Sequence, residues 1–191
     1  MRYRSSQGFT IGPIEFLILV NILLFVVVLI RPELRYDLGL NRLFFTDRPW
    51  TLLTHMFIHA GFWHIFANML TLYFFGRYVY SLIGEGKFLI VYFLGGLLGG
   101  GLYLLMADPQ ATAVGASGAI FAVAGALTVM RPRLTVFVFP IPVPIPLWVA
   151  VIGGFIIMSF ASFIAWQAHL GGLVLGLIAG LFFRRRARFY R

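Results

Sequence analysis

The longest charge-free stretch of the chain constrains its fold more than any other feature. No Asp, Glu, Lys or Arg occurs between Arg133 and Arg184, a length that allows two bilayer crossings at about 20 residues each. Of the 191 residues, 61% are hydrophobic and 11% are charged, whereas soluble globular domains carry about 25% charged residues. The composition excludes a soluble globular protein and predicts an all-α membrane protein that crosses the bilayer several times.

Hydropathy predicts a bundle of six transmembrane helices. The N-terminal apolar run lacks a small-residue cleavage site, which favours a retained span over a signal peptide. The six predicted spans cover approximately residues 11–30, 63–83, 87–106, 116–131, 145–163 and 168–183.

The distribution of Lys and Arg predicts the orientation of this bundle. With six spans both termini lie on one side, and that side carries 11 Lys and Arg residues against 4 on the other. Both termini are therefore expected in the cytoplasm, which gives a cytoplasmic N-terminus (1–10), a six-span domain (11–183) and a basic tail (184–191). The formal charge of +9 is concentrated in that tail, where anionic lipid headgroups explain it without nucleic acid.

Two connecting segments differ from ordinary loops. Residues 31–62 mix charged residues and prolines with aromatic residues, which predicts a long loop lying partly in the membrane interface. Residues 139–146 alternate proline with apolar residues, so they cannot form a helix and are expected to run extended.

Polar side chains that could carry chemistry fall in the first turns of the second, fourth and sixth spans. His64 and Asn68 lie one helical turn apart, Ser117 belongs to Gly-Ala-Ser-Gly, and His169 begins the sixth span. These three spans all start at the outer surface, so the four residues share one depth. A hydroxyl, an imidazole and further hydrogen-bonding groups in one layer are typical of nucleophilic acyl transfer. The chain has no cysteine, so a covalent nucleophile must be oxygen or nitrogen.

Small residues at a spacing of four predict close packing of the fourth and sixth spans. Such packing would bring Ser117 within hydrogen-bond distance of His169, which would accept the hydroxyl proton and return it to the leaving amine. Backbone N–H groups at the start of the fourth span, with Asn68 and His64, would stabilise the oxyanion. The two ridges are Gly118, Ala122 and Ala126, and Gly172, Gly176 and Gly180.

Each feature also has a purely structural interpretation. Gly-x-Ser-Gly alone more often reflects helix packing, and Ala119 in place of a second glycine argues against the soluble hydrolase elbow. An intramembrane histidine serves function or interhelical bonding about equally often. The series His55, His59 and His64 suggests a metal, but no His-Glu-x-x-His is present, so neither a metal nor a cofactor is expected.

Taken together, the motifs resemble those of the rhomboid family of intramembrane serine proteases, over about residues 48–183. The resemblance is specific because three motifs occur jointly, in the family's order. They are His64-x-x-x-Asn68, Gly115-Ala116-Ser117-Gly118 and Ala168-His169-x-x-Gly172-x-x-x-Gly176.

The resemblance implies a six-helix rhomboid-like fold and a serine endopeptidase without a catalytic carboxylate. It implies Ser117 as nucleophile, His169 as general base, and an oxyanion hole formed by the Ser117 N–H, His64 and Asn68. The expected substrates are single-span membrane proteins, cleaved near the outer leaflet at small residues where the helix can unwind. The fifth span, with Gly153-Gly154, is the hypothesised lateral gate. Without an organelle-targeting peptide, the plasma membrane fits best.

The sequence departs from the family pattern at two positions. Trp50 is followed by Thr51 where members often carry arginine, the nearest arginine being Arg48, and Phe121 stands where tyrosine is common. Two alternatives to a protease are a non-enzymatic protein that binds and escorts membrane helices, and a small transporter with a histidine proton relay. The intact serine, histidine and asparagine disfavour the first, and the lack of mid-span acidic residues or an internal repeat disfavours the second.

Overall fold

The structure is a computed structural model that describes residues 11–138, 141–160 and 165–184. Several segments discussed above lie outside the described residues: the N-terminus 1–10, residues 139–140 of the connector, the end of the fifth predicted span at 161–163, and the tail beyond Arg184. The described part is mostly helical.

A helix occupies each of the six predicted ranges, but the helices differ in length. Among the described residues, three are long and apolar enough to cross a membrane: α1 (Pro13–Ile30), α6 (Glu85–Met106) and α9 (Trp166–Arg184). α7 (Ser117–Met130) and α8 (Leu147–Ser159) are apolar but shorter. The number of six crossings therefore remains a prediction.

The second predicted span is helical throughout but is not one regular α-helix. It consists of α4 (Phe62–Thr71), a π-helical segment η2 (Leu72–Gly76) and α5 (Arg77–Ile83). Gly84, with φ of +78°, ends α5 and begins α6. A positive φ favours glycine at this turn because other residues meet a steric penalty there.

The expected all-α class needs a small correction, because two short antiparallel ladders join the loops. β1 (Leu40–Asn41) pairs with β2 (Thr112–Ala113), and β3 (Thr135–Val136) pairs with β4 (Ile145–Pro146). The extended conformation predicted for the connector is found at β4. These ladders pair backbone N–H and C=O groups of loops that would otherwise lie unpaired near the membrane interface.

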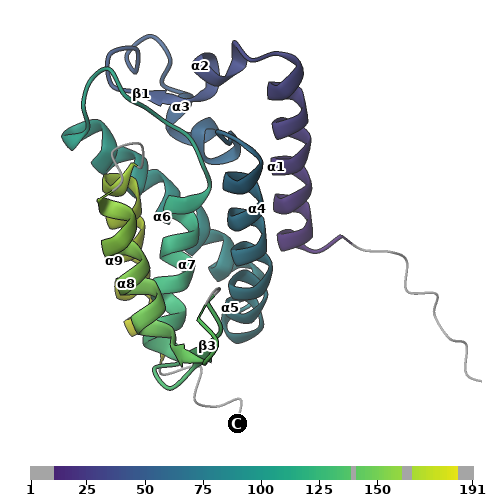
Figure 1. Ribbon diagram of the computed structural model, residues 1–191, viewed down its shortest axis with the longest axis vertical. Coiled ribbons are helices and arrows are strands. Elements are labelled where there is room, and N and C mark those ends of the chain that lie inside the picture. Colours follow the sequence, from purple (N-terminus) through teal and green to yellow (C-terminus); the bar gives the residue numbers. More distant parts are fainter. Residues whose placement is uncertain (1–10, 139–140, 161–164, 185–191) are drawn as a thin grey trace, which may run out of the picture.

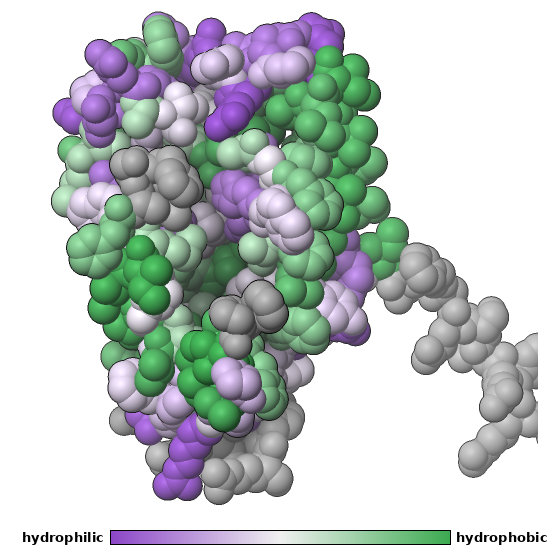
Figure 2. Space-filling view, viewed as in Figure 1, coloured by the Kyte–Doolittle hydropathy of each residue, from purple (hydrophilic) through white to green (hydrophobic). Residues whose placement is uncertain are grey.

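The long segment before α4 contains short helices and lies at one end of the molecule, opposite β3 (Figure 1). It includes α2 (Leu34–Leu38), α3 (Thr51–Thr54) and the 3-10 turn η1 (His55–Phe57). Hydrophilic residues gather at this end, whereas hydrophobic side chains cover the outer face of α1 (Figure 2). This distribution suits a loop at the membrane surface above an apolar bundle.

The short helix α7 forms the centre of the bundle, between α4 and α9 (Figure 1). Eleven of its 14 residues are buried, most of them Gly, Ala or another apolar residue. α6 packs against both α7 and α9. A helix enclosed by its neighbours in this way holds its first residue at a fixed place inside the bundle, and in α7 that residue is Ser117.

Candidate active site

Ser117 and His169 meet between the first turns of α7 and α9. The His169 Nε2 atom lies 2.7 Å from the Ser117 hydroxyl oxygen, and the His169 side chain is almost completely buried. At this distance the hydroxyl donates to an unprotonated Nε2, which is the arrangement a general base needs. The structure therefore brings together the two residues that the sequence nominated as nucleophile and base.

The two ridges of small residues face each other in register. A Cβ added to Gly172 or Gly176 would overlap the backbone carbonyl oxygen of Gly118 or Ala122, respectively. One added to Gly180 would lie 2.8 Å from the carbonyl oxygen of Ala126. The backbones of α7 and α9 touch along three successive turns, and this contact sets the distance between the hydroxyl and the imidazole.

α6 holds His169 from the other side, a contact that the sequence analysis missed. A Cβ at Gly99 would overlap the carbonyl oxygen of Ala168, and one at Gly171 would lie 2.9 Å from the carbonyl oxygen of Leu98. The repeated glycines of α6 were the available signal, but their pattern does not say which helix they face. The start of α9, which carries His169, is thus packed between the backbones of α6 and α7.

Phe121 supports the imidazole of His169 from one turn further along α7. The two rings are stacked, with centroids 4.7 Å apart and an interplanar angle of 29°. Phe121 also contacts Phe155 of α8 edge-on at 6.1 Å. An aromatic face can stabilise an imidazolium by about 0.5–1 kcal/mol or more, and Phe121 presents such a face to His169 without a hydroxyl.

Gly115 leaves a space between Ser117 and His64. Its φ is +126°, and its N–H donates to the carbonyl oxygen of His55 at 2.8 Å. A Cβ at this position would lie 2.8 Å from the His64 Nε2 atom and 3.6 Å from the Ser117 hydroxyl oxygen. The missing side chain therefore opens the volume that an oxyanion formed at Ser117 would need.

The tautomer of His64 suits hydrogen-bond donation into this space. Its Nδ1 atom accepts from the Ala60 N–H at 3.3 Å, so the neutral ring carries its hydrogen on Nε2. The first N–H groups of α7 have no intrahelical acceptor and carry the positive end of the helix dipole. The His64 Nε2 atom and the Ser117 hydroxyl oxygen both border the position that a Gly115 Cβ would take.

Asn68 lies on the same face of α4 and is buried. Its Nδ2 atom donates to the carbonyl oxygen of His64 at 2.7 Å, and its Oδ1 atom has no partner among the described residues. Within the described part of the chain, no hydrogen bond joins Asn68 or His64 to Ser117. The role of both residues as oxyanion donors stays a prediction.

The two remaining histidines are buried in the loop before α4. His55 bonds the Thr51 carbonyl oxygen through Nδ1 at 2.9 Å, and His59 packs edge-on against His64 with centroids 5.0 Å apart. Burial lowers the pKa of His55 to about 4; burial and then the neighbouring His64 lower the pKa of His59 to about 3. Both rings are neutral near pH 7, and the described residues contain no group of three or more side chains placed to hold a metal.

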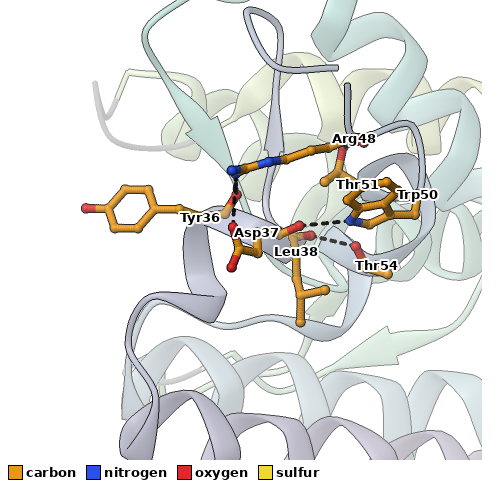
Figure 3. A network of polar contacts seen from close by, with 7 residues as sticks. All are labelled: Tyr36, Asp37, Leu38, Arg48, Trp50, Thr51 and Thr54. Carbon is orange, nitrogen blue, oxygen red and sulfur yellow. Dashed lines mark hydrogen bonds and ion pairs between the residues drawn. The ribbon is translucent and has the colours of Figure 1, made fainter. Parts of the chain in front are cut away.

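The long loop before α4 is anchored by side chains that belong to none of the three sequence motifs (Figure 3). The Trp50 Nε1–H donates to the Asp37 carbonyl oxygen at 3.0 Å, and the Thr54 hydroxyl donates to that of Leu38 at 2.7 Å. Arg48 donates to the Tyr36 carbonyl oxygen at 3.0 Å and lies 3.2 Å from the Asp37 carboxylate. Arg48 thus supplies a guanidinium beside Trp50, although the position after Trp50 holds threonine.

The comparisons with known proteins all indicate the same family. The profile of the Rhomboid domain matches residues 46–186. The rhomboid protease GluP of Bacillus subtilis is 35% identical over 141 residues, which cover 73% of this chain and 27% of that protein. The putative rhomboid protease YdcA of the same organism is 33% identical over 148 residues, which cover 74% and 71%.

The similarity also extends to a relative named as inactive. Inactive RHOMBOID-like protein 8 of Arabidopsis thaliana is 30% identical over 78 residues, which cover 41% of this chain and 22% of that protein. For three further relatives the chain spans only 36–40% of their length. Family membership alone therefore does not decide between a protease and a protein without activity.

Proposed function

Because the chain belongs to the rhomboid family and is a multi-pass membrane protein, we propose that it is an intramembrane serine protease. It hydrolyses peptide bonds in or near the transmembrane helices of other membrane proteins. The observation that carries this proposal is the 2.7 Å separation between the Ser117 hydroxyl oxygen and the His169 Nε2 atom. A hydroxyl at hydrogen-bond distance from a buried, unprotonated imidazole is the pair that nucleophilic catalysis by serine requires.

The reaction uses the pair twice. The Ser117 oxygen attacks the scissile carbonyl carbon while its proton moves to His169 Nε2, and the proton then passes to the leaving amine as the C–N bond breaks. A water molecule attacks the resulting ester, with His169 again as base, and releases the new carboxyl end. The serine hydroxyl is restored, so the cycle balances without a metal or redox step.

Groups beside the dyad stabilise the two charges that form during these steps, on the oxyanion and on the imidazolium. The Ser117 N–H, His64 and Asn68 are the proposed donors to the oxyanion, and losing one such donor typically costs about 3 kcal/mol of transition-state stabilisation. The His169 Nδ1 atom is buried without a partner among the described residues. The stacked face of Phe121 then stabilises the imidazolium in place of a carboxylate.

The membrane arrangement follows from the charge distribution and the order of the helices. We propose six crossings, both termini in the cytoplasm, and a site that opens near the outer leaflet of the plasma membrane. Substrates are single-span membrane proteins that enter laterally past α8, where Gly153 and Gly154 have open space around them. Anionic headgroups hold the basic tail.

A non-enzymatic, helix-binding function is the second candidate, suggested by the inactive relative. It predicts that the chain binds membrane helices but leaves Ser117 unreactive. The part-buried hydrogen bond between the Ser117 hydroxyl and the His169 imidazole favours the protease, since binding alone does not require it.

Replacement of the nucleophile separates the two candidates. Ser117→Ala is expected to lower the rate of cleavage of a reconstituted single-span substrate by at least about a thousandfold, because no other group replaces the attacking oxygen. Ser81→Ala is the matched control, since that exposed hydroxyl donates to the Tyr78 carbonyl oxygen of its own helix. Cleavage is followed by gel electrophoresis of the two fragments. Equal rates for wild type and Ser117→Ala would refute the assignment.

A further inference from the structure

The conformation of Gly115 is not fixed by its own residue type. Glycine adopts positive and negative φ about equally readily, so contacts outside the residue must hold its φ at +126°. The Gly115 N–H donates to the carbonyl oxygen of His55 at 2.8 Å, and that oxygen also accepts from the Ile58 N–H at 3.3 Å. Because Gly115 closely precedes Ser117 in the chain, a change in its φ would move the nucleophile together with the backbone N–H proposed as an oxyanion donor.

The side chain of His55 is itself held on two sides. Its Nδ1 atom lies 2.9 Å from the Thr51 carbonyl oxygen, which can only accept, so Nδ1 carries the hydrogen of the neutral ring. A Cβ added to Gly100 of α6 would lie 2.9 Å from the His55 Cε1 atom, so the ring rests directly on that helix. The side chain is almost completely buried. A ring packed in this way keeps the backbone carbonyl group of the same residue in one place.

The start of the loop before α7 is fixed by β1, which rests on the same glycine of α6. A Cβ at Gly100 would lie 3.2 Å from the Cδ2 atom of Leu40 in β1, and β1 pairs with β2. The Asn41 side chain adds a hydrogen bond to the Ala111 carbonyl oxygen at 3.0 Å. β1 therefore holds the start of this loop, and the His55 carbonyl group holds the end next to the nucleophile.

Resting on the proposed protease function, we propose that His55 is a positioning residue, which holds the Gly115 peptide group in the orientation that the oxyanion space beside Ser117 requires. His55 acts through its backbone carbonyl oxygen, and its side chain keeps that oxygen in place. It takes no part in proton transfer, because its ring is bonded to Thr51 and packed on α6. Loss of this support therefore lowers kcat, whereas the binding of the substrate helix, and with it KM, changes little.

A buried histidine that only fills the core is the alternative. The neighbouring residue of the same loop offers a comparison, because the Thr54 hydroxyl donates to the Leu38 carbonyl oxygen at 2.7 Å (Figure 3). That hydrogen bond does not involve Gly115 or α7. Anchoring of the loop alone predicts that loss of either side-chain hydrogen bond has the same effect on cleavage, whereas positioning predicts a fall in kcat for His55 only.

Replacement of these two neighbouring side chains tests the proposal. His55→Leu keeps a similar volume but removes the N–H that Thr51 accepts. Its kcat on a reconstituted single-span substrate is expected to fall about tenfold with KM unchanged, since a misplacement of about 1 Å can cost about a hundredfold. The asparagine amide can place an N–H close to the position of the imidazole Nδ1–H, so His55→Asn is expected to recover most of the rate. Thr54→Val, the matched control, is expected to keep the wild-type kcat.

Gly100→Ala reaches the same histidine without replacing it. The added Cβ would lie 2.9 Å from the His55 Cε1 atom and must displace the ring, so kcat is expected to fall by a similar factor. Gly101→Ala adds a methyl group in open space on the same helix and is expected to leave kcat unchanged. This second pair decides the matter if the thermal unfolding midpoint in detergent shows that His55→Leu does not fold.

Labelling of Ser117 by a fluorophosphonate separates the possible failures, and its rate in His55→Leu is expected to fall in parallel with kcat. Wild type that neither cleaves nor becomes labelled would refute the protease function and this inference with it. If wild type is active and both His55→Leu and Gly100→Ala keep its kcat, the positioning role alone is wrong. It is also wrong if Thr54→Val loses as much kcat as His55→Leu, or if His55→Asn is no faster than His55→Leu.

Discussion

Gly172→Ala is expected to abolish cleavage by forcing Ser117 and His169 apart. The added Cβ would overlap the backbone carbonyl oxygen of Gly118, and a backbone atom cannot rotate away as a side chain does. The two helices must therefore separate, and a misplacement of about 1 Å at the reacting atoms can cost about a hundredfold in rate. Overpacking of this kind also destabilises a protein by about 1–3 kcal/mol.

The measurement is kcat/KM for the reconstituted substrate, together with the thermal unfolding midpoint in detergent. Gly101→Ala is the matched control, because that glycine lies within α6 with open space where its Cβ would be. The control should keep the wild-type rate and unfolding midpoint. Wild-type cleavage by Gly172→Ala would show that the contact between α7 and α9 does not position the dyad.

The second large effect is expected for Gly115→Ala, which should leave the protein folded but strongly lower its rate of cleavage. A Cβ there would lie 2.8 Å from two ring atoms of His64 and 3.6 Å from the Ser117 hydroxyl oxygen, within the space proposed for the oxyanion. Alanine also meets a steric penalty at the φ of +126°. We expect kcat to fall by about a hundredfold or more in Gly115→Ala, since at least one donor loses access to the oxyanion.

Comparing kcat with the thermal unfolding midpoint separates an effect on catalysis from a loss of the fold. The unfolding midpoint of Gly115→Ala is expected to change by only a few degrees, because an unfavourable φ costs about 1–2 kcal/mol. Gly61→Ala is the control at a glycine that precedes α4, whose φ of 178° is ordinary extended backbone and whose added Cβ would touch nothing. It should cleave normally. A Gly115→Ala enzyme as fast as wild type would place the oxyanion elsewhere.

The sequence predicts the meeting of Ser117 and His169 because the determinants of this contact are local and periodic. The position of a residue in the first turn of a span sets its depth, and residues four apart lie on one helix face. Ser117, His169 and the two ridges of small residues are all specified in this way, and the structure has the facing residues in register. The helix positions follow equally from hydropathy alone.

The contacts that the sequence did not predict depend on pairing across long separations. The glycines of α6 show that something packs closely, but not that Ala168 and Gly171 are the partners. The anchoring of the loop by Arg48 and Trp50 uses backbone carbonyl groups, which every residue possesses and which therefore leave no pattern. The π segment η2 is also invisible to hydropathy, since it changes the backbone hydrogen bonding without changing the composition.

Covalent labelling tests most directly whether Ser117 and His169 act as one catalytic unit. Purified protein is treated with a fluorophosphonate, and the modified residue is identified by peptide mass spectrometry. The account predicts that Ser117 alone among the serines is modified, and that His169→Asn suppresses the labelling by at least about a hundredfold. Modification of Ser81 or Ser159 at the same rate as Ser117, or unchanged labelling of Ser117 in His169→Asn, would contradict it.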